Sequence, residues 1–332
     1  MNITILGSGG WGTALALLLH ENGHAVTLWS AFAAESAHLQ SKRENPYLPG
    51  IALPDAITCT ADLDCVCTAE MLVLATPSFA VRKTAAALRG RIQAGIPLVI
   101  VSKGIEQESL QNFSSVVGEQ LGSDTPLAVL SGPSHAEEVA RGVPTACVAA
   151  AADIAVAEQV QDAFMCDHFR VYTSTDVAGV ELGAALKNVI ALCAGASDGL
   201  GYGDNTTAML VTRGLHEMIA LAEATGGCAE TLTGLAGLGD LIVTCTSRHS
   251  RNRRAGVLIG RGVPVPSAME QVGGVVEGYY AAAAAMKLAK EFGIEMPITE
   301  QLYQVLYEEK DPKEVLNELM TRAKKAEGAG IT

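Results

Sequence analysis

The sequence contains no Cys-x-x-Cys pair, and its eight cysteines are scattered singly apart from Cys65 and Cys67. No histidine spacing accompanies them that would build a zinc site. We therefore expect no metal, and we interpret the cysteines as reduced core residues of a cytosolic protein.

Basic residues are also scarce. The chain has 23 Lys and Arg against 36 Asp and Glu, which gives a formal net charge of −13 and a pI near 5.0. Such a protein is poorly suited to bind nucleic acid or an anionic membrane surface, so we expect neither partner. An anionic small molecule would have to be held by a local cluster of basic side chains.

A charged N-terminal leader is missing, and no apolar run approaches the roughly 18 residues of a membrane span. The chain opens directly into the apolar stretch Asn2–Leu6, and nothing in it indicates targeting, so we expect a cytoplasmic location. What the chain has is 332 residues, 49% of them hydrophobic, with a mean hydropathy of +0.26. This is enough for two domains with a sizeable core.

The first half of the chain alternates short apolar runs with amphipathic ones. This alternation predicts a parallel sheet covered by helices on both faces. Ligands of open parallel sheets bind outside the carboxyl ends of the strands, so we expect the small and polar loops after four of these runs to share one edge. The predicted strands are 2–6, 25–29, 71–75, 97–101, 126–130 and 146–150.

A glycine motif follows the first predicted strand. Gly7-Ser8-Gly9-Gly10-Trp11-Gly12 fits the pattern G-x-G-x-x-G, with a strand before it and a helix after it. The first glycine permits a tight turn, the second lets the backbone approach a pyrophosphate, and the third allows close helix–strand packing. The phosphates would then face a helix N-terminus. A dinucleotide cofactor is therefore predicted, against the alternative of a glycine turn with no ligand.

The choice between NAD and NADP stays open. The second strand of such a fold usually ends in an acid that binds a ribose 2′-hydroxyl, or in an arginine that accepts a 2′-phosphate. Here Ser30-Ala31-Phe32 follows the strand, and it offers neither. Glu35, Lys42 or Arg43 could reach in from the next segment, although solvated surface charge is the more common state of such residues.

From Gly179 onward the pattern is nearly all helical, with long runs at 207–225, 253–260, 277–292 and 312–325. We place the domain boundary near residue 178. The predicted fold class is α/β, with a Rossmann-type doubly wound parallel sheet that binds the dinucleotide over residues 1–178. An all-helical substrate and catalytic domain is predicted over residues 179–332.

A single lysine, Lys187, interrupts the buried helical pattern of Gly179–Leu192. No carboxylate lies within one helical turn of it, and a buried lysine is costly unless it is paired or loses its charge. One interpretation is a lysine whose stem follows a helix edge to solvent. The other is a reactive amine. Its neighbours three and four residues away are all apolar or small: Gly183, Ala184, Ile190 and Ala191.

One dense basic cluster is present, at Arg248–Arg254. Ser250 or Asn252 can cap the helix that follows, and arginine offers a planar fork to a phosphate group. The cluster is thus a candidate phosphomonoester site, although a solvated basic turn would have the same composition. Upstream, Asp240 lies between a glycine-rich turn and an apolar run, where capping alone would be the common explanation.

At this point a family can be named, because long motifs occur in its order along almost the whole chain: GSGGWGTALA, ENPYLPG, VSKGIE, LSGPSHAEEVARGVPTA, ELGAALKNVIAL, DGLGYGDNT, GLGDLIVTCTS, SRNRRAG and VVEGYY. The sequence closely resembles the soluble NAD(P)-dependent glycerol-3-phosphate dehydrogenases of bacteria. The resemblance implies interconversion of dihydroxyacetone phosphate and sn-glycerol 3-phosphate by hydride transfer with NAD(P)H. It also implies a supply of glycerol 3-phosphate for phospholipid synthesis, and a homodimer.

The resemblance further implies site residues. The catalytic residues would be Lys187, Lys103 and Asp240. The substrate would contact Lys103, Gly132, Ser134, Lys187, Asp240, Ser250, Arg251 and Asn252. The cofactor would contact Gly7, Gly9, Gly10, Trp11, Gly12, Lys103, Ala136, Arg251, Val275 and Glu277.

In that family Lys187 would act as the acid and base at the substrate oxygen. Burial on an apolar helix face and a second lysine nearby would both lower its pKa from about 10.4 toward neutrality. The chain departs from the family at Ala31, where many members carry a basic residue that favours NADP. This departure keeps the cofactor preference open.

Two alternative functions share part of this pattern. Two-domain reductases of 2-dehydropantoate or hydroxyacyl substrates share the nucleotide-binding half, but they lack the combination of GLGDLIVTCTS and SRNRRAG. A non-catalytic dinucleotide sensor would need none of Lys103, Lys187 and Asp240, all of which are present.

Overall fold

The computed structural model describes residues 1–324, 326 and 327. They form two compact units: unit 1 contains Met1–Ser102 and Gln111–Val177, and unit 2 contains Lys103–Leu110 and the chain from Ala178 onward. Lys103–Leu110 thus packs with unit 2, whereas the sequence pattern assigns it to the first domain. The division into functional domains at residue 178 stays a prediction, and its stated end at residue 332 lies outside the described residues.

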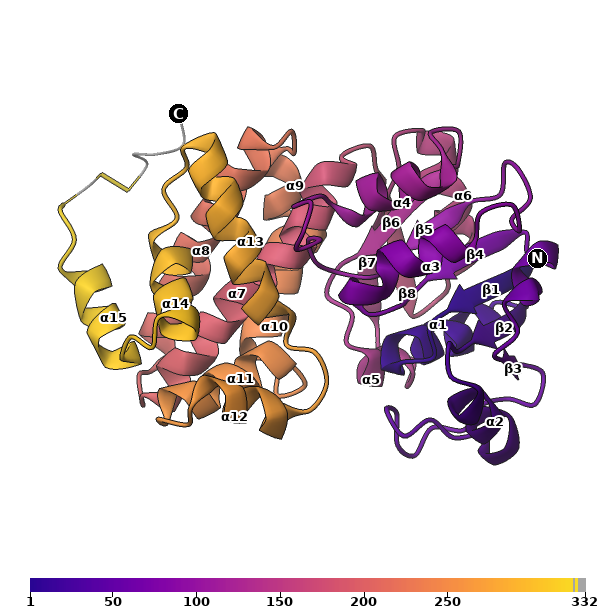
Figure 1. Ribbon diagram of the computed structural model, residues 1–332, viewed down its shortest axis with the longest axis horizontal. Coiled ribbons are helices and arrows are strands. Elements are labelled where there is room, and N and C mark those ends of the chain that lie inside the picture. Colours follow the sequence, from indigo (N-terminus) through magenta and orange to yellow (C-terminus); the bar gives the residue numbers. More distant parts are fainter. Residues whose placement is uncertain (325, 328–332) are drawn as a thin grey trace. The chain divides into compact units, whose positions relative to one another are not determined.

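Unit 1 is built on an eight-stranded sheet in the order β3-β2-β1-β4-β5-β6-β7-β8 (Figure 1). The pairs from β3 to β6 are parallel, which confirms the Rossmann-type fold class. The strands are β1 (Asn2–Leu6), β2 (Ala25–Trp29), β3 (Thr58–Thr60), β4 (Met71–Leu74), β5 (Leu98–Ile100), β6 (Leu127–Ser131), β7 (Thr145–Ala150) and β8 (Phe169–Ser174).

The sheet differs from the prediction at three strands. β7 runs antiparallel to β6, so the sheet is mixed at this end, and β8 then pairs in parallel with β7. β3 and β8 were not predicted as strands. β3 has only three residues, Thr-Cys-Thr, and β8 alternates buried and exposed residues, so neither forms the continuous apolar run that marks the inner strands.

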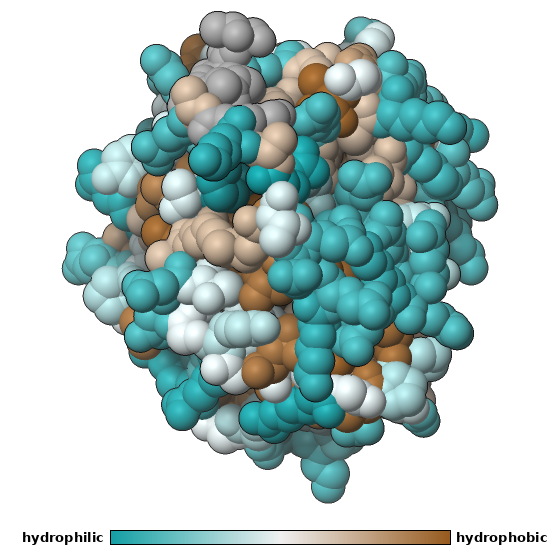
Figure 2. Space-filling view, turned by 90° about the vertical axis from the view of Figure 1, so that its left-hand side faces the viewer, coloured by the Kyte–Doolittle hydropathy of each residue, from teal (hydrophilic) through white to brown (hydrophobic). Residues whose placement is uncertain are grey.

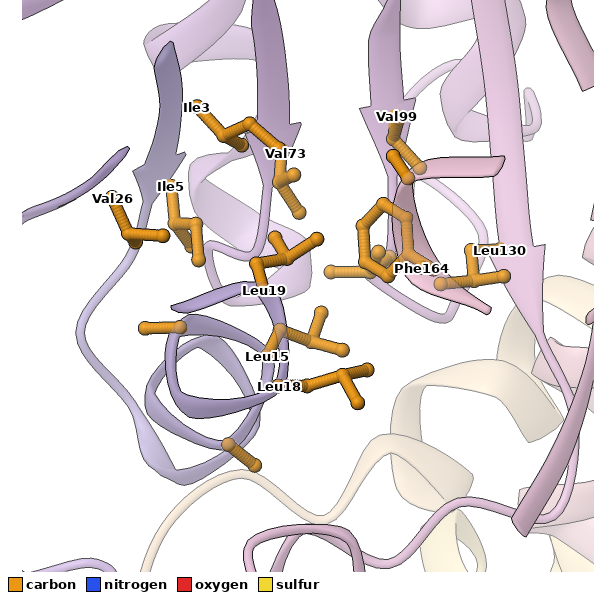
Figure 3. Close-up of a cluster of buried hydrophobic side chains, with 14 of the residues drawn as sticks. Ile3, Ile5, Leu15, Leu18, Leu19, Val26, Val73, Val99, Leu130 and Phe164 are labelled. Atoms are coloured by element: carbon orange, nitrogen blue, oxygen red, sulfur yellow. The ribbon is translucent and has the colours of Figure 1, made fainter. Parts of the chain in front are cut away.

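One face of the central strands packs on α1 and α6. Figure 3 shows strand residues of this core gathered against Leu15 and Leu19 of α1 and Phe164 of α6. On the other side, α3 and α4 pack on each other, and α4 contacts β6. The helices of unit 1 are α1 (Gly10–Glu21), α2 (Ala33–Lys42), α3 (Val81–Ala87), α4 (Phe113–Leu121), α5 (Ala136–Val139) and α6 (Ile154–Phe164), with short 3-10 turns at Leu63–Thr68 and Ser78–Ala80.

From Ala178 to Met320, unit 2 consists of helices joined by loops, as the periodicity predicts. The predicted helix at 277–292 has the same bounds in the structure, the one at 253–260 begins two residues earlier, and the one at 312–325 ends at Met320, with Lys325 outside the described residues. The helices are α7 (Val177–Gly199), α8 (Asp204–Ala224), α9 (Ala229–Thr233), α10 (Asp240–Thr246), α11 (Arg251–Gly260), α12 (Val265–Val272), α13 (Glu277–Phe292), α14 (Pro297–Tyr307) and α15 (Pro312–Met320).

α7 corrects one sequence-based statement. With 23 residues and a mean hydropathy of 1.6, it is long and apolar enough to cross a membrane, whereas the sequence pattern predicts no such run. Residues 179–192 are all buried, so α7 is a core helix. The face of the molecule in Figure 2 is mainly hydrophilic, with separate hydrophobic patches.

The cysteines also differ in part from expectation. Cys59, Cys147 and Cys245 are buried in the core as expected. Cys67 and Cys228 are exposed, so they are not core residues.

Candidate active site

The glycine loop between β1 and α1 has the shape that its spacing predicts. Gly7 has a φ of +124°, and a Cβ added there would lie 2.5 Å from the carbonyl oxygen of Ala75. A Cβ on Gly12 would lie 1.9 Å from the carbonyl oxygen of Gly7. A Cβ on Gly9 would meet no heavy atom within 4 Å. Gly7 and Gly12 are therefore required by internal packing, whereas Gly9 leaves the backbone open to a ligand.

Polar atoms without partners lie around this loop. The indole N–H of Trp11 and the hydroxyl of Thr76 are buried with no hydrogen-bond partner among the described residues. Thr76 follows β4 and lies against Gly7, and Ala136, at the start of α5, lies beside Gly10. Together with the N-terminus of α1, this loop fits the pyrophosphate of a dinucleotide.

In unit 2, Lys187 finds a carboxylate that the local sequence does not offer. Its Nζ donates to Oδ1 of Asp240, the first residue of α10, and to the hydroxyl of Thr244 at 3.0 Å. Nζ of Lys103 donates to the other carboxylate oxygen, Oδ2, at 2.7 Å. Asp240 thus bridges two lysines, and the structure brings together all three of the predicted catalytic residues. The carboxylate that Lys187 lacks within one helical turn is therefore supplied by Asp240, 53 residues further on.

Local structure explains how Asp240 reaches Lys187. A π-helical turn, Leu235–Gly239, leads into α10, and such turns often occur at functional sites. Asp240 and Thr244 are four residues apart on α10, so both side chains lie on the helix face that meets Lys187. Thr244 also donates to the backbone carbonyl oxygen of Asp240 at 2.6 Å, which fixes its hydroxyl as an acceptor for the lysine.

Lys103 is held in this cluster by the residues that follow it. Ile105 is buried in a core cluster of unit 2 with Leu182 and Leu186 of α7. The side chain of Lys103 is 19% exposed, while that of Asp240 is 2% exposed and that of Lys187 is 8% exposed. Lys103 is therefore the more accessible cation, and Lys187 is the more enclosed one.

Burial tunes the protonation of the cluster. It lowers the pKa of Lys187 from its usual 10.5 to about 8, with Asp240 opposing this change and the charge of Lys103 adding to it. Burial alone would raise the pKa of Asp240, but Lys103 and Lys187 more than offset it and hold the pKa below its usual value. Asp240 is therefore ionised at neutral pH, and Lys187 can exchange a proton near pH 8.

A second network joins α7 to the start of α11. The side-chain amide of Asn252 donates to Oδ1 of Asn188 at 2.8 Å, and its oxygen accepts from the backbone N–H of Gly278 at 2.8 Å. This close approach depends on glycine, because a Cβ on Gly256 of α11 would lie 2.2 Å from the carbonyl oxygen of Leu192. Asn252 thus joins the start of α11 to α7 at the residue that follows Lys187 in the chain.

The basic cluster lies at the N-terminus of α11. Ser250 caps the helix by accepting from the backbone N–H of Arg253 at 3.1 Å. Arg251 is exposed, and its guanidinium lies against the turn at Gly274. Val275 follows Gly274, and Glu277 is the first residue of α13. The predicted phosphate and cofactor residues of unit 2 therefore form one group; their roles stay predictions.

The remaining predicted residues belong to unit 1. Gly132 follows β6, where a Cβ would lie 2.9 Å from the carbonyl oxygen of Ala146. The hydroxyl of Ser134 donates to the carbonyl oxygen of Gly132 at 2.9 Å. Their contact with substrate stays a prediction. In the part of the chain that the structure describes, no three His, Cys, Asp or Glu side chains gather as a metal site.

Sequence reasoning missed Thr244 and Asn188. Both are in quoted motifs, but an isolated Thr or Asn carries no signal of its own. The signal for Thr244 was its spacing of four residues from Asp240, and for Asn188 its position next to the single lysine of α7.

A glycine loop shaped for a dinucleotide and a buried carboxylate between two lysines are the features that we expect of an NAD(P)-dependent oxidoreductase. Residues 2–157 match the family model for the N-terminus of NAD-dependent glycerol-3-phosphate dehydrogenase, and residues 176–317 match the model for its C-terminus. The chain belongs to this family.

Two relatives illustrate the match. The chain is 50% identical to the glycerol-3-phosphate dehydrogenase [NAD(P)+] of Fusobacterium nucleatum over 98% of both chains. The crystal structure of glycerol-3-phosphate dehydrogenase from Coxiella burnetii superposes with a TM-score of 0.93 at 40% identity, covering 97% of this chain and 99% of that one. A ketopantoate reductase from Ralstonia eutropha, at 15% identity and a TM-score of 0.61, shares the fold alone.

Proposed function

We propose that this protein interconverts dihydroxyacetone phosphate and sn-glycerol 3-phosphate with NAD(P)H. The observation that carries the proposal is the Lys103–Asp240–Lys187 cluster, in a chain that belongs to the glycerol-3-phosphate dehydrogenase family over both of its halves. NAD or NADP is the cofactor, and the glycine loop is the part of unit 1 that fits its pyrophosphate.

When bound, the nicotinamide cofactor supplies the hydride that reduces C2 of the ketone. Lys187 donates a proton from Nζ to the C2 oxygen as negative charge develops there, and in the reverse direction its neutral amine removes that proton. With a pKa of about 8, both forms of Lys187 are accessible near neutral pH. Asp240 and Thr244 hold Nζ in place, and Lys103 supplies a second positive charge for the developing oxyanion.

The phosphate group of the substrate would be held by Ser250, Arg251 and Asn252. A helix N-terminus and an exposed guanidinium are both suited to a phosphate dianion. The bonds of Asn252 to Asn188 and Gly278 use its oxygen and one side-chain N–H, so the second N–H and the backbone N–H are the donors that would contact the phosphate. Family resemblance also predicts substrate contacts for Gly132 and Ser134.

The test is oxidation of NADH and NADPH, followed by absorbance, with dihydroxyacetone phosphate as the substrate. Dihydroxyacetone without phosphate and 2-dehydropantoate are the comparison substrates. We expect turnover with the phosphorylated ketone alone. Equal turnover of dihydroxyacetone would contradict the proposed binding of the substrate phosphate at α11. Turnover of 2-dehydropantoate would favour the alternative function as a reductase of that substrate. A protein that binds the cofactor but turns over none of these substrates would instead behave as a sensor.

We further propose that the protein is a cytoplasmic homodimer that supplies glycerol 3-phosphate for phospholipid synthesis, with neither nucleic acid nor membrane as a partner. Family resemblance supports the dimer and the metabolic role, and the acidic composition supports the last point. Light scattering of the purified protein tests the dimer. Retention on DNA or on anionic vesicles at low salt would contradict the expected absence of those partners.

A further inference from the structure

The carboxyl end of β2 lies directly beside the glycine loop. The backbone N–H of Gly7 donates to the carbonyl oxygen of Trp29, the last residue of β2, at 3.0 Å. In a doubly wound sheet the adenosine half of a dinucleotide extends over this strand end. The residue found there, Ser30, cannot by itself distinguish a 2′-hydroxyl from a 2′-phosphate by charge.

A carboxylate is nevertheless held at this strand end. Ser30 is 2% exposed, and its hydroxyl donates to Oε2 of Glu35 in the first turn of α2 at 2.5 Å. The same hydroxyl oxygen accepts from the backbone N–H of Phe32 at 3.2 Å. A serine hydroxyl has one proton to donate, and Ser30 donates it to the Glu35 carboxylate, which is thereby held in place. Glu35 also lies about 20 residues beyond the glycine motif, the usual distance of a ribose-binding acid.

The basic side chains nearby are placed elsewhere. Arg43 donates to the carbonyl oxygen of Ile57 at 2.7 Å and lies 3.5 Å from a carboxylate oxygen of Asp55. Lys42 is in the last turn of α2, about 10 Å along the helix axis from Glu35. The exposed residue next to Ser30 is Ala31, which is uncharged. The charge fixed at the end of β2 is therefore negative.

We propose that Glu35, positioned by Ser30, binds the ribose 2′-hydroxyl of the cofactor and makes the protein prefer NADH to NADPH. The inference rests on the proposed function, since it concerns the cofactor of that reaction. An ionised carboxylate has acceptor sites on both oxygens, so Glu35 can accept from the ribose hydroxyl while it accepts from Ser30. A 2′-phosphate would place like charges in contact at the same point, and the affinity for NADPH falls accordingly.

The experiment measures dissociation constants of NADH and NADPH by fluorescence titration, without substrate. AMP and adenosine 2′,5′-bisphosphate serve as displacing probes, because they differ only by the 2′-phosphate. The parent protein binds NADH and AMP more tightly than their 2′-phosphorylated counterparts, by about tenfold or more. Glu35→Gln keeps an acceptor oxygen but removes the charge, so it reduces both preferences by about tenfold, mainly through tighter binding of the phosphorylated ligand.

Two further sets of variants distinguish the effects of the Glu35 charge and of its position from a loss of folding stability. Glu158→Gln removes one negative charge from an exposed site on α6 and leaves both ratios unchanged. Ser30→Ala releases the carboxylate and reduces the preferences, whereas Ser30→Thr retains a hydroxyl and preserves them. Thermal unfolding of each variant shows whether unit 1 is intact. A structural hydrogen bond alone would change this stability but not the ratio of affinities.

The proposal is overturned if the parent protein binds NADPH as tightly as NADH, or if Glu35→Gln changes the ratios no more than Glu158→Gln does. Either result would leave the proposed reaction intact as long as dihydroxyacetone phosphate is reduced. Conversely, a Glu35-dependent preference for NADH in a protein that does not reduce this ketone would support the cofactor inference and remove the proposed function.

Discussion

The glycine loop of unit 1 and the lysine cluster of unit 2 are built in opposite ways. The loop is continuous in sequence, and its key residues act through backbone and through the absence of side chains. The cluster joins side chains from three separate segments, around Lys103, Lys187 and Asp240, and it depends on buried charge. A loop of this kind suits tight holding of a cofactor, whereas a buried charged cluster suits the transfer of a proton. Substitutions in the loop should therefore lower the affinity for the cofactor, and substitutions in the cluster should lower the catalytic rate.

The largest effect is expected for Lys187→Met. Methionine keeps most of the stem volume, and Asp240 retains its ion pair with Lys103, so the protein should fold and bind cofactor nearly as the parent does. Turnover should fall by about 10²–10⁴-fold, because general acid–base catalysis is lost. Single-turnover reduction by bound NADH or NADPH in a stopped-flow instrument measures this directly.

The matched control is Lys290→Met, which removes an exposed lysine from α13. It should leave the rate unchanged. A Lys187→Met protein that keeps more than about a tenth of the parent rate would contradict the catalytic role and favour a lysine that only snorkels from a helix edge.

Arg251→Ala should have the next largest effect, and it should act on substrate rather than on chemistry. Loss of a charge-assisted contact to the phosphate should weaken substrate binding by about 1.5–3 kcal/mol, which appears as a higher KM. Inorganic phosphate should inhibit the parent competitively with dihydroxyacetone phosphate. If neither result is seen, the phosphate site lies outside the N-terminus of α11.

The same contrast explains which parts the sequence predicts. The loop Gly7–Gly12 could be located from spacing alone, because its function is local. The pairing of Lys187 with Asp240 could not, since nothing in the apolar run Gly179–Leu192 specifies which distant carboxylate meets it; family resemblance supplied that pair. β7 was predicted as a strand but not as antiparallel, because an apolar run carries no direction. The sequence alone favours surface charge for Glu35, because only the fold shows that its carboxylate accepts a hydrogen bond from Ser30.

The pH dependence of the reaction rate should also report the protonation state of Lys187. Ketone reduction needs protonated Lys187, so kcat/KM for dihydroxyacetone phosphate should fall about tenfold per pH unit above pH 8. Oxidation of glycerol 3-phosphate needs the neutral amine, so it should rise with pH up to about 8 and then level. Initial rates from pH 6 to 10 in both directions test this. The same profile in Lys187→Met would assign the titration to another group.

Glycine substitutions should divide the loop into packing and binding positions. Gly12→Ala forces a Cβ to within 1.9 Å of the Gly7 carbonyl oxygen, so it should lower the free energy of unfolding by about 1–3 kcal/mol. Gly9→Ala meets no heavy atom within 4 Å, so stability should change by less than about 0.5 kcal/mol while the affinity for NADH falls about tenfold. Urea unfolding and NADH titration of both variants separate these outcomes. Equal NADH affinity in Gly9→Ala would place the pyrophosphate away from Gly9.

The smallest effect is expected for Ala31→Arg. This variant tests whether the cofactor preference of unit 1 can be changed without a change in the catalytic rate that depends on unit 2. Ala31 is exposed and follows Ser30, so an arginine there can reach a 2′-phosphate from solvent and partly offset the Glu35 carboxylate. The KM for NADPH relative to that for NADH should fall severalfold, while kcat stays within about twofold because Lys187 and Asp240 belong to unit 2. Ala94→Arg adds the same charge before β5, at the amino edge of the sheet, and it should leave the ratio unchanged. If Ala31→Arg leaves the ratio unchanged as well, the 2′ position of the cofactor is recognised elsewhere in the chain.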